Sequence, residues 1–317
     1  MTTSLVIGGA GFIGSHIVDA LLARGDQVRV FDNLSSGNPK NLTAVIDQID
    51  FVEGNILDEA AVVKAMTGVD FVFHLAAMVS VPESMKQPVE AELINTVGTL
   101  NVLQAAQRAK VKRLVLSSTC AVYGDEPTLP KTELMAPQPQ SPYAISKLAA
   151  ESYCNLFTQS FSLETVVLRY FNVFGPRQDP SSVYSGVISI FVDKMMHGLP
   201  LFIFGDGQQT RDFVFVKDIV RANLLAAETP AAVGQVFGIG TGRAVTINQL
   251  FESLQKILEQ EIEPIYKPER SGDIRYSYCD PTLANKVLGW EAQVSLEHGL
   301  SALVESIDPE PHTPPQK

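Results

Sequence analysis

The chain has 317 residues, of which 45% are hydrophobic and 19% charged, and its formal net charge at pH 7 is −11. This composition is typical of a packed globular protein with one large or two smaller domains, and it excludes a largely disordered chain. The negative charge argues against a nucleic acid or an anionic membrane surface as the main partner, since both bind positively charged faces.

The three cysteines and five histidines are widely scattered, so the sequence predicts neither a disulfide framework nor a metal site. No basic segment precedes the apolar run that starts at Ser4, and no apolar run approaches the roughly 18 residues of a membrane span. We therefore expect a cytoplasmic protein without a signal peptide or a membrane-spanning helix.

Short apolar runs and helical patterns alternate through the first half of the chain. Strands are predicted at 5–7, 28–31, 51–52, 71–73, 114–116 and 165–168, and helices at 12–24, 89–109 and 142–160. Such alternation predicts a Rossmann-type α/β fold, in which helices cover both faces of a doubly wound parallel sheet.

The second half is less regular, with helices predicted near 186–197, 248–259 and 281–288. We predict a nucleotide-binding domain over 1–168, and we expect the strand and helix within 213–243 to rejoin its sheet. A smaller α+β C-terminal lobe is predicted over 169–212 and 244–308. The proline-rich residues 309–317 are predicted to form a flexible tail.

Three glycines lie between the first predicted strand and the first helix. Gly8, Gly11 and Gly14 form the pattern G-x-x-G-x-x-G, and Asp32 ends the second strand. Glycine lets the pyrophosphate of a dinucleotide approach the helix N-terminus, where the amides and the helix dipole favour negative charge. The Asp32 carboxylate would accept hydrogen bonds from the adenosine ribose and repel a 2′-phosphate, which favours NAD over NADP. The alternative is a plain glycine turn followed by a solvated aspartate.

A second pattern begins the helix predicted at 142–160. Ser141 is a suitable N-cap and Pro142 fits the first helical position, so Tyr143 and Lys147 project from one face of the first turns. A lysine ammonium beside a phenol lowers the phenol pKa and would make Tyr143 a general base for an alcohol proton. Y-x-x-x-K is common on any helix, but here it follows a dinucleotide-binding pattern. The hydroxyls at 117–119 follow the fifth strand, at the sheet edge where ligands bind.

Together these motifs resemble the extended short-chain dehydrogenase/reductase family, in its nucleotide-sugar epimerase branch. The matching segments are GGAGFIG at 8–14, DNLSSG at 32–37, HLAA at 74–77, SST at 117–119, SPYAISK at 141–147, RYFNVFGP at 169–176, GDGQQTRDF at 205–213 and RSGDIR at 270–275. The resemblance implies NAD as a cofactor that stays bound. It also implies that Thr119, Tyr143 and Lys147 act together on the sugar 4-hydroxyl.

The resemblance extends to the residues around each ligand. The cofactor contacts it implies are Gly8, Gly11, Phe12, Ile13, Asp32, Asn33, Ser36, Gly37, Asn55, Ile56, Leu75, Ala76, Ala77, Asn95, Ser117, Tyr143, Lys147 and Tyr170. The contacts it implies for a UDP-sugar are Ser80, Val81, Thr119, Asn172, Gln178, Arg211, Arg270, Asp273 and Ser277. In relatives, helices corresponding to 89–109 and 142–160 pair across a two-fold axis, so a homodimer built on a four-helix bundle is expected.

The resemblance also limits which reaction and which sugar we expect. Related dehydratases carry acidic residues after the catalytic threonine, whereas Cys120 and Ala121 follow Thr119 here, which disfavours loss of water. At the position of Ser277, a tyrosine restricts related epimerases to plain hexoses, while a small residue admits an N-acetyl group. The sequence thus favours a UDP-N-acetylglucosamine 4-epimerase that also accepts UDP-glucose. The alternatives are a UDP-glucose 4-epimerase, a UDP-uronate 4-epimerase, a net NAD-dependent dehydrogenase or reductase, and a non-catalytic dinucleotide sensor.

Overall fold

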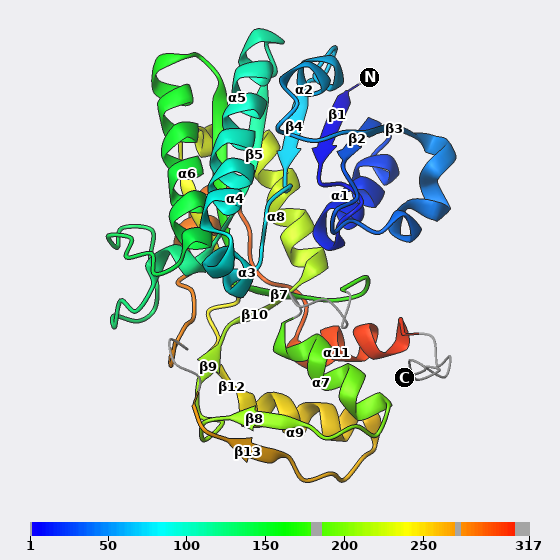
Figure 1. Ribbon diagram of the computed structural model, residues 1–317, viewed down its shortest axis with the longest axis vertical. Coiled ribbons are helices and arrows are strands. Elements are labelled where there is room, and N and C mark those ends of the chain that lie inside the picture. The colour runs from blue at the N-terminus through cyan, green and yellow to red at the C-terminus, as the bar shows by residue number, and fades with distance from the viewer. Residues whose placement is uncertain (1, 179–185, 270–273, 308–317) are drawn as a thin grey trace.

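A seven-stranded parallel sheet forms the centre of the computed structural model, which describes residues 2–178, 186–269 and 274–307 (Figure 1). The strand order is β3-β2-β1-β4-β5-β6-β11. The strands are β1 (Thr3–Ile7), β2 (Gln27–Asp32), β3 (Ile49–Glu53), β4 (Phe71–His74), β5 (Arg113–Thr119), β6 (Glu164–Tyr170) and β11 (Val236–Ile239). The predicted Rossmann-type α/β fold is confirmed, and the order reverses between β1 and β4, where such sheets bind ligands.

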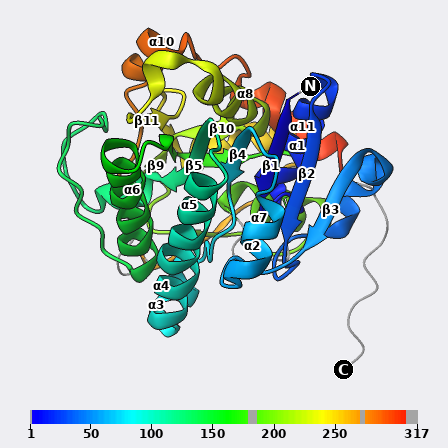
Figure 2. The ribbon, with the colours of Figure 1, turned by 90° about the horizontal axis from the view of Figure 1, so that it is seen from above.

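Helices cover both faces of this sheet (Figures 1 and 2). One face carries α1 (Phe12–Ala23) and α8 (Val216–Glu228), and the other carries α2 (Glu59–Ala65), α5 (Gly98–Arg108) and α6 (Pro142–Ser160). Side chains alternate along β1, so that Val6 enters the core beneath α1 while Leu5 and Ile7 enter the core beneath α5. Apolar residues on both sides of a strand are typical of a doubly covered parallel sheet.

The helix predicted at 89–109 is interrupted. Two further short helices, α3 (Val81–Lys86) and α4 (Pro88–Glu92), lead into a π-helical turn at Leu93–Val97, which continues into α5. The amide of Gly98 donates to the carbonyl of Leu93, five residues back. Such turns insert one extra residue and often occur at functional sites; this one places Asn95 beside the carboxyl edge of β4.

A smaller lobe lies below the sheet in Figure 1 and has its own apolar core. Three short strand pairs belong to it or link it to the sheet: β7 (Asn172–Phe174) with β10 (Phe213–Phe215), β8 (Phe202–Phe204) with β13 (Ile265–Lys267), and β9 (Thr210–Arg211) with β12 (Val245–Thr246). Its helices are α7 (Val187–Met196), α9 (Ile247–Leu258) and α11 (Leu296–Glu305). Phe191, Ile203 and Leu250 meet in the core of this lobe.

Two segments depart from the expected grouping. Within 213–243, β11 joins the large sheet and α8 packs against it. The strand β10 instead pairs with β7 outside this sheet. Helix α10 (Thr282–Leu288), which the sequence groups with the C-terminal lobe, packs against α8 and β11 (Figure 2). The reason is that Ala284, Leu288 and the fully buried Trp290 extend the apolar core between the sheet and α8.

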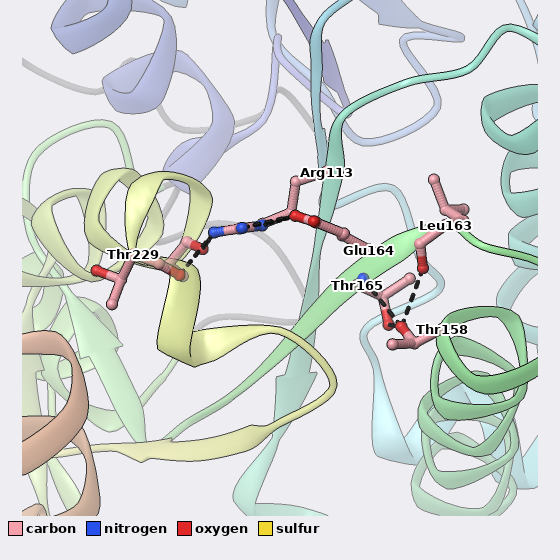
Figure 3. Close-up of polar contacts among 7 residues, drawn as sticks. Arg113, Thr158, Leu163, Glu164, Thr165 and Thr229 are labelled. Atoms are coloured by element: carbon pink, nitrogen blue, oxygen red, sulfur yellow. Dashed lines mark hydrogen bonds and ion pairs between the residues drawn. The ribbon is translucent and has the colours of Figure 1, made fainter.

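Polar contacts hold together the amino-terminal ends of β5 and β6, at the edge opposite the ligand-binding edge (Figure 3). The Arg113 guanidinium donates to the Glu164 carboxylate at 2.6 Å and to the Thr229 carbonyl at 2.7 Å. The Thr158 hydroxyl, near the end of α6, lies 2.8 Å from the Thr165 hydroxyl. These contacts fix α6 and the segment after α8 relative to the sheet. Within the described ranges, no helix is long and apolar enough to cross a bilayer.

Candidate active site

The glycine turn between β1 and α1 is packed so tightly that side chains are excluded. Gly8 has φ +84°, and a Cβ there would lie 2.7 Å from the Ala76 amide nitrogen. A Cβ on Gly14 would lie 2.1 Å from the Gly8 carbonyl oxygen. Gly11 is the N-cap of α1, and no side chain caps this helix. The start of α1 therefore presents backbone amides rather than side chains, which suits the pyrophosphate of a dinucleotide.

Asp32 closes the same turn from the end of β2. Its carboxylate accepts hydrogen bonds from the Ala10 amide at 2.9 Å and the Leu34 amide at 2.8 Å, and the residue is buried. A Cβ on Gly37 would lie 2.9 Å from this carboxylate, so glycine is needed for the loop to approach it. Each carboxylate oxygen has a second lone pair, so Asp32 keeps acceptor capacity for the predicted contact with the adenosine ribose of NAD.

The other predicted cofactor residues fall into two groups. Most lie at the carboxyl ends of β1, β2, β3 and β4 or on the helices that follow them: Phe12, Ile13, Asn33, Ser36, Asn55, Ile56, Leu75, Ala76, Ala77 and Asn95. Ser117 and Tyr170 instead bond each other at 2.9 Å, and the Tyr170 hydroxyl also bonds Asn223 of α8. The first group thus lies along the ligand-binding edge of the sheet, whereas Ser117 and Tyr170 bond each other and Tyr170 also bonds α8.

Tyr143 and Lys147 lie on the first two turns of α6, whose start matches the sequence signals. The Ser141 hydroxyl accepts from the Ala144 amide at 3.2 Å, and Pro142 occupies the first helical position. The Tyr143 phenol lies beside the Thr119 hydroxyl, which comes from the end of β5 and accepts from the Ala121 amide at 3.1 Å. Two hydroxyls from different elements therefore meet where one substrate oxygen could contact both.

The pKa values at this site correct one expectation. Burial raises the pKa of Tyr143 to about 12, although the neighbouring Thr119 hydroxyl opposes the rise. Burial lowers the pKa of Lys147 to about 8, against the charge of Glu151. The sequence predicts that Lys147 lowers the Tyr143 pKa, but desolvation outweighs any such effect in the protein alone, because a buried site disfavours the charged form of both groups.

The π-helical turn adds a fixed amide beside these residues. The Asn95 side chain donates to the Met78 carbonyl at 3.1 Å and to the Ser146 hydroxyl at 3.0 Å, and it accepts from the Met78 amide at 2.8 Å. The Thr99 hydroxyl donates to the Asn95 backbone carbonyl at 2.6 Å. Asn95 therefore joins the segment after β4 to α6 next to Lys147.

The predicted substrate residues lie on the other side of Thr119. The Asn172 side chain donates to the Asp212 backbone carbonyl at 3.2 Å. Arg211, which directly precedes Asp212, is half-buried. Ser277 is buried, and its side chain lies beside the Cys120 thiol. Cys120 directly follows Thr119, so position 277 lies close to the reacting hydroxyls although it is far away in sequence.

The remaining predicted substrate residues are spread more widely. Ser80 is the N-cap of α3, where its hydroxyl accepts from the Glu83 amide at 3.0 Å, and Val81 is exposed. The Gln178 side chain has a buried oxygen without a protein partner in the described structure. Arg270 and Asp273 lie outside the described residues.

Two buried carboxylates that the sequence analysis missed support the site. Asp212 accepts from the amides of Thr241, Gly242 and Cys279, at 2.8 to 3.1 Å, and so gathers three loops behind Arg211. Glu151 lies on α6 one turn after Lys147 and forms an ion pair with Arg169 at 2.7 Å. The spacing of Tyr143, Lys147 and Glu151 on one helical face was the available signal for Glu151.

A Rossmann-type sheet with a glycine turn, together with a Thr–Tyr–Lys cluster at its carboxyl edge, defines the short-chain dehydrogenase/reductase class. The model of the NAD dependent epimerase/dehydratase family matches residues 4–240, and the chain belongs to this family. It is 41% identical over 306 residues to the UDP-glucose 4-epimerase of Mycolicibacterium smegmatis, with 95% of this chain and 97% of that protein covered.

Two solved structures are similar over almost the whole chain. A UDP-glucose 4-epimerase from Thermotoga maritima, with UDP-glucose, is 45% identical with a TM-score of 0.92, covering 96% of this chain and 98% of that one. A UDP-N-acetylglucosamine 4-epimerase from Methanobrevibacter ruminantium, in complex with UDP-N-acetylmuramic acid, is 39% identical with a TM-score of 0.92, covering 96% and 97%. The resemblance predicted from the motifs is confirmed at the level of the family.

Proposed function

We propose that this protein is an NAD-dependent 4-epimerase that interconverts UDP-N-acetylglucosamine and UDP-N-acetylgalactosamine and also accepts UDP-glucose and UDP-galactose. The proximity of the Thr119 and Tyr143 hydroxyls carries the proposal, because the two groups together can hold the oxygen of one sugar hydroxyl. The glycine turn and Asp32 would hold the pyrophosphate and adenosine ribose of NAD. Similarity to 4-epimerases over 95% of the chain supports the same reaction.

In the proposed mechanism, Tyr143 removes the proton of the sugar 4-hydroxyl while Thr119 holds the same oxygen. When bound, oxidised NAD would accept the hydride that leaves C4 of the sugar. Its positive charge would also favour a phenolate next to it. Lys147 would hold the nicotinamide ribose and contribute a second positive charge. Rotation of the 4-keto sugar within the pocket would turn its other face towards the cofactor site. The hydride taken from C4 would return to that face as Tyr143 returns the proton to the oxygen, which gives the epimer with no net oxidation.

The choice of an N-acetylated sugar rests on position 277. Ser277 lies beside Cys120, which directly follows Thr119, and this proximity supports a role for position 277 near the reacting part of the sugar. Serine is small enough to leave room for an N-acetyl group, whereas a tyrosine ring would fill that space. Burial raises the pKa of the Cys120 thiol to about 11, so a neutral thiol is expected to line the pocket near pH 7.

We also propose that two copies pair through α5 and α6, which lie side by side in the structure. A groove of about 370 Å³ between them is lined by Leu100, Tyr153, Leu156, Phe157 and Phe161. Leu156 and Phe161 are 43% and 46% exposed. A second copy related by a two-fold axis would present the same two helices and complete a four-helix bundle that buries these side chains.

The deciding experiment is proton NMR of the anomeric region after the enzyme, without added NAD, is mixed with UDP-N-acetylglucosamine or with UDP-glucose. New galacto-configured signals from both sugars are the expected result. Signals from UDP-glucose alone would retain the 4-epimerase mechanism and overturn the argument from Ser277. No change with either sugar, even after NAD is supplied, would overturn the proposed function.

A further inference from the structure

A buried acidic side chain lies directly behind the candidate catalytic groups. The Glu151 carboxylate accepts from the Ser118 hydroxyl, and it accepts from Arg169 Nε at 3.1 and 3.2 Å and from Arg169 Nη2 at 2.7 Å. All three residues are at most 5% exposed. Ser118 and Arg169 are paired in the register of β5 and β6, so both side chains point towards α6.

These contacts fix both chain neighbours of Thr119. Ser118 precedes Thr119 on β5 and bonds Glu151 directly. A 3₁₀ turn at Cys120–Tyr123 follows Thr119, and the Arg169 guanidinium lies 4.9 Å from the centre of the Tyr123 ring. Glu151 is therefore linked to the chain before Thr119 through one hydrogen bond, and to the chain after it through Arg169.

The same carboxylate belongs to the helix that carries Tyr143. Glu151 lies two turns beyond Tyr143 on α6, on the face that packs against β5 and β6. The Thr119 and Tyr143 side chains bring β5 and α6 together at the site, and the hydrogen bond between Ser118 and Glu151 joins the same two elements behind it. Two attachment points define the orientation of a strand end on a helix better than one.

We propose that Glu151 is a positioning residue that holds the Thr119 hydroxyl against Tyr143 by fastening the end of β5 to α6. The inference rests on the proposed function, because it assigns Thr119 and Tyr143 to one reacting oxygen. Glu151 is buried behind these groups, so it acts through Ser118 and Arg169 rather than on the sugar. A displacement of about 1 Å at such a site lowers turnover by about 100-fold.

The competing explanation is a purely structural ion pair. Such a pair contributes to folding, and its loss lowers stability without changing turnover by the molecules that remain folded. The two explanations differ in kcat measured per folded, NAD-loaded molecule. Positioning of Thr119 predicts a lower kcat with an unchanged KM, because the contacts that bind the nucleotide lie elsewhere.

Ser118→Ala is the mildest test, since it removes one hydrogen bond and leaves the ion pair in place. We expect kcat for epimerisation to fall about 10- to 100-fold, with KM for the UDP-sugar within about twofold of wild type. Ser189→Ala is the matched control, because Ser189 is a buried serine of α7 whose hydroxyl has no partner in the described structure. A wild-type kcat in Ser118→Ala would overturn the proposal.

A double variant tests the carboxylate itself. Glu151→Gln alone would leave the Arg169 charge buried without its partner and risks misfolding, whereas Glu151→Met with Arg169→Met replaces the whole pair by apolar side chains of similar length. We expect this variant to fold, to retain NAD and to lose kcat at least as severely as Ser118→Ala. A folded double variant with wild-type kcat would also contradict positioning.

One readout separates this inference from the proposed function. The ring carbon that bears the Tyr143 hydroxyl, labelled with ¹³C and assigned by its absence in Tyr143→Phe, reports the position of the neighbouring Thr119 hydroxyl without any substrate. We expect its NMR signal to move in Ser118→Ala and to stay in place in Ser189→Ala. If the signal moves while wild-type enzyme epimerises no UDP-sugar, the proposed function fails and the positioning role stands; an unmoved signal overturns the positioning role.

Discussion

The hydroxyl of Thr119, at the end of β5, lies beside the phenol of Tyr143, at the start of α6. This proximity brings a strand and a helix together at the carboxyl edge of the sheet, and the Thr119 hydroxyl opposes the rise in the Tyr143 pKa that burial causes. A substrate hydroxyl placed between the two groups could donate to one and accept from the other.

Replacing Tyr143 with phenylalanine removes the proposed base and keeps the ring. We expect kcat to fall by about 10² to 10⁴, the usual contribution of a general acid–base group, while NAD remains bound. Epimerisation is followed by NMR, and NAD content by absorbance after denaturation. Tyr266→Phe, at a half-exposed tyrosine of the small lobe, serves as the control. Undiminished turnover by Tyr143→Phe would require another base.

Lys147→Met is expected to abolish turnover and yet to stabilise the cofactor-free protein at pH 7. The folded protein holds the lysine pKa at about 8 instead of 10.5, so charging this buried amine costs about 3 kcal/mol of folding stability below pH 8. Between pH 8 and 10.5 the unfolded chain binds the extra proton, and wild-type stability should rise with pH there. Denaturant unfolding at several pH values measures the difference, which should shrink towards pH 10.5. A variant less stable than wild type at pH 7 would contradict the assigned pKa.

Ser277→Tyr should narrow the substrate range. A ring beside Cys120 and Thr119 occupies the space assigned to the N-acetyl group, and overpacking of this kind costs about 1 to 3 kcal/mol or more. We expect kcat/KM for UDP-N-acetylglucosamine to fall at least tenfold, with less change for UDP-glucose. Ser277→Ala should keep both activities. Equal losses for both sugars would indicate that the tyrosine disturbs the whole site.

Leu156→Glu should separate the proposed dimer. The change places a charge in the groove between α5 and α6, where a second copy would have to bury it. Light scattering after size exclusion is expected to give a dimer for wild type and a monomer for the variant. Ile46→Glu alters a similarly exposed apolar residue outside this groove and should leave the mass unchanged. A monomeric wild-type protein would contradict the bundle.

The sequence was sufficient to predict those features that depend on interactions between residues close together in the chain. The alternation of strands and helices predicted the parallel sheet, and Ser141 with Pro142 marked the start of α6, because backbone periodicity and helix capping depend on a few neighbouring residues. The pattern missed the π-helical turn around Asn95. Neighbouring residues do not reveal the side-chain contacts of Asn95, because these contacts depend on distant segments.

The sequence by itself determined the fold class, the family and the residues expected at the nucleotide and at the reacting hydroxyl. Only the tertiary structure decided that burial raises the Tyr143 pKa, that Ser277 meets Cys120, and that Glu151 links Ser118 to Arg169. A pKa depends on how much water the surrounding elements exclude, and a contact between distant residues depends on how whole elements pack. Neighbouring residues in the chain therefore determine neither the pKa of a buried group nor the contacts between distant residues.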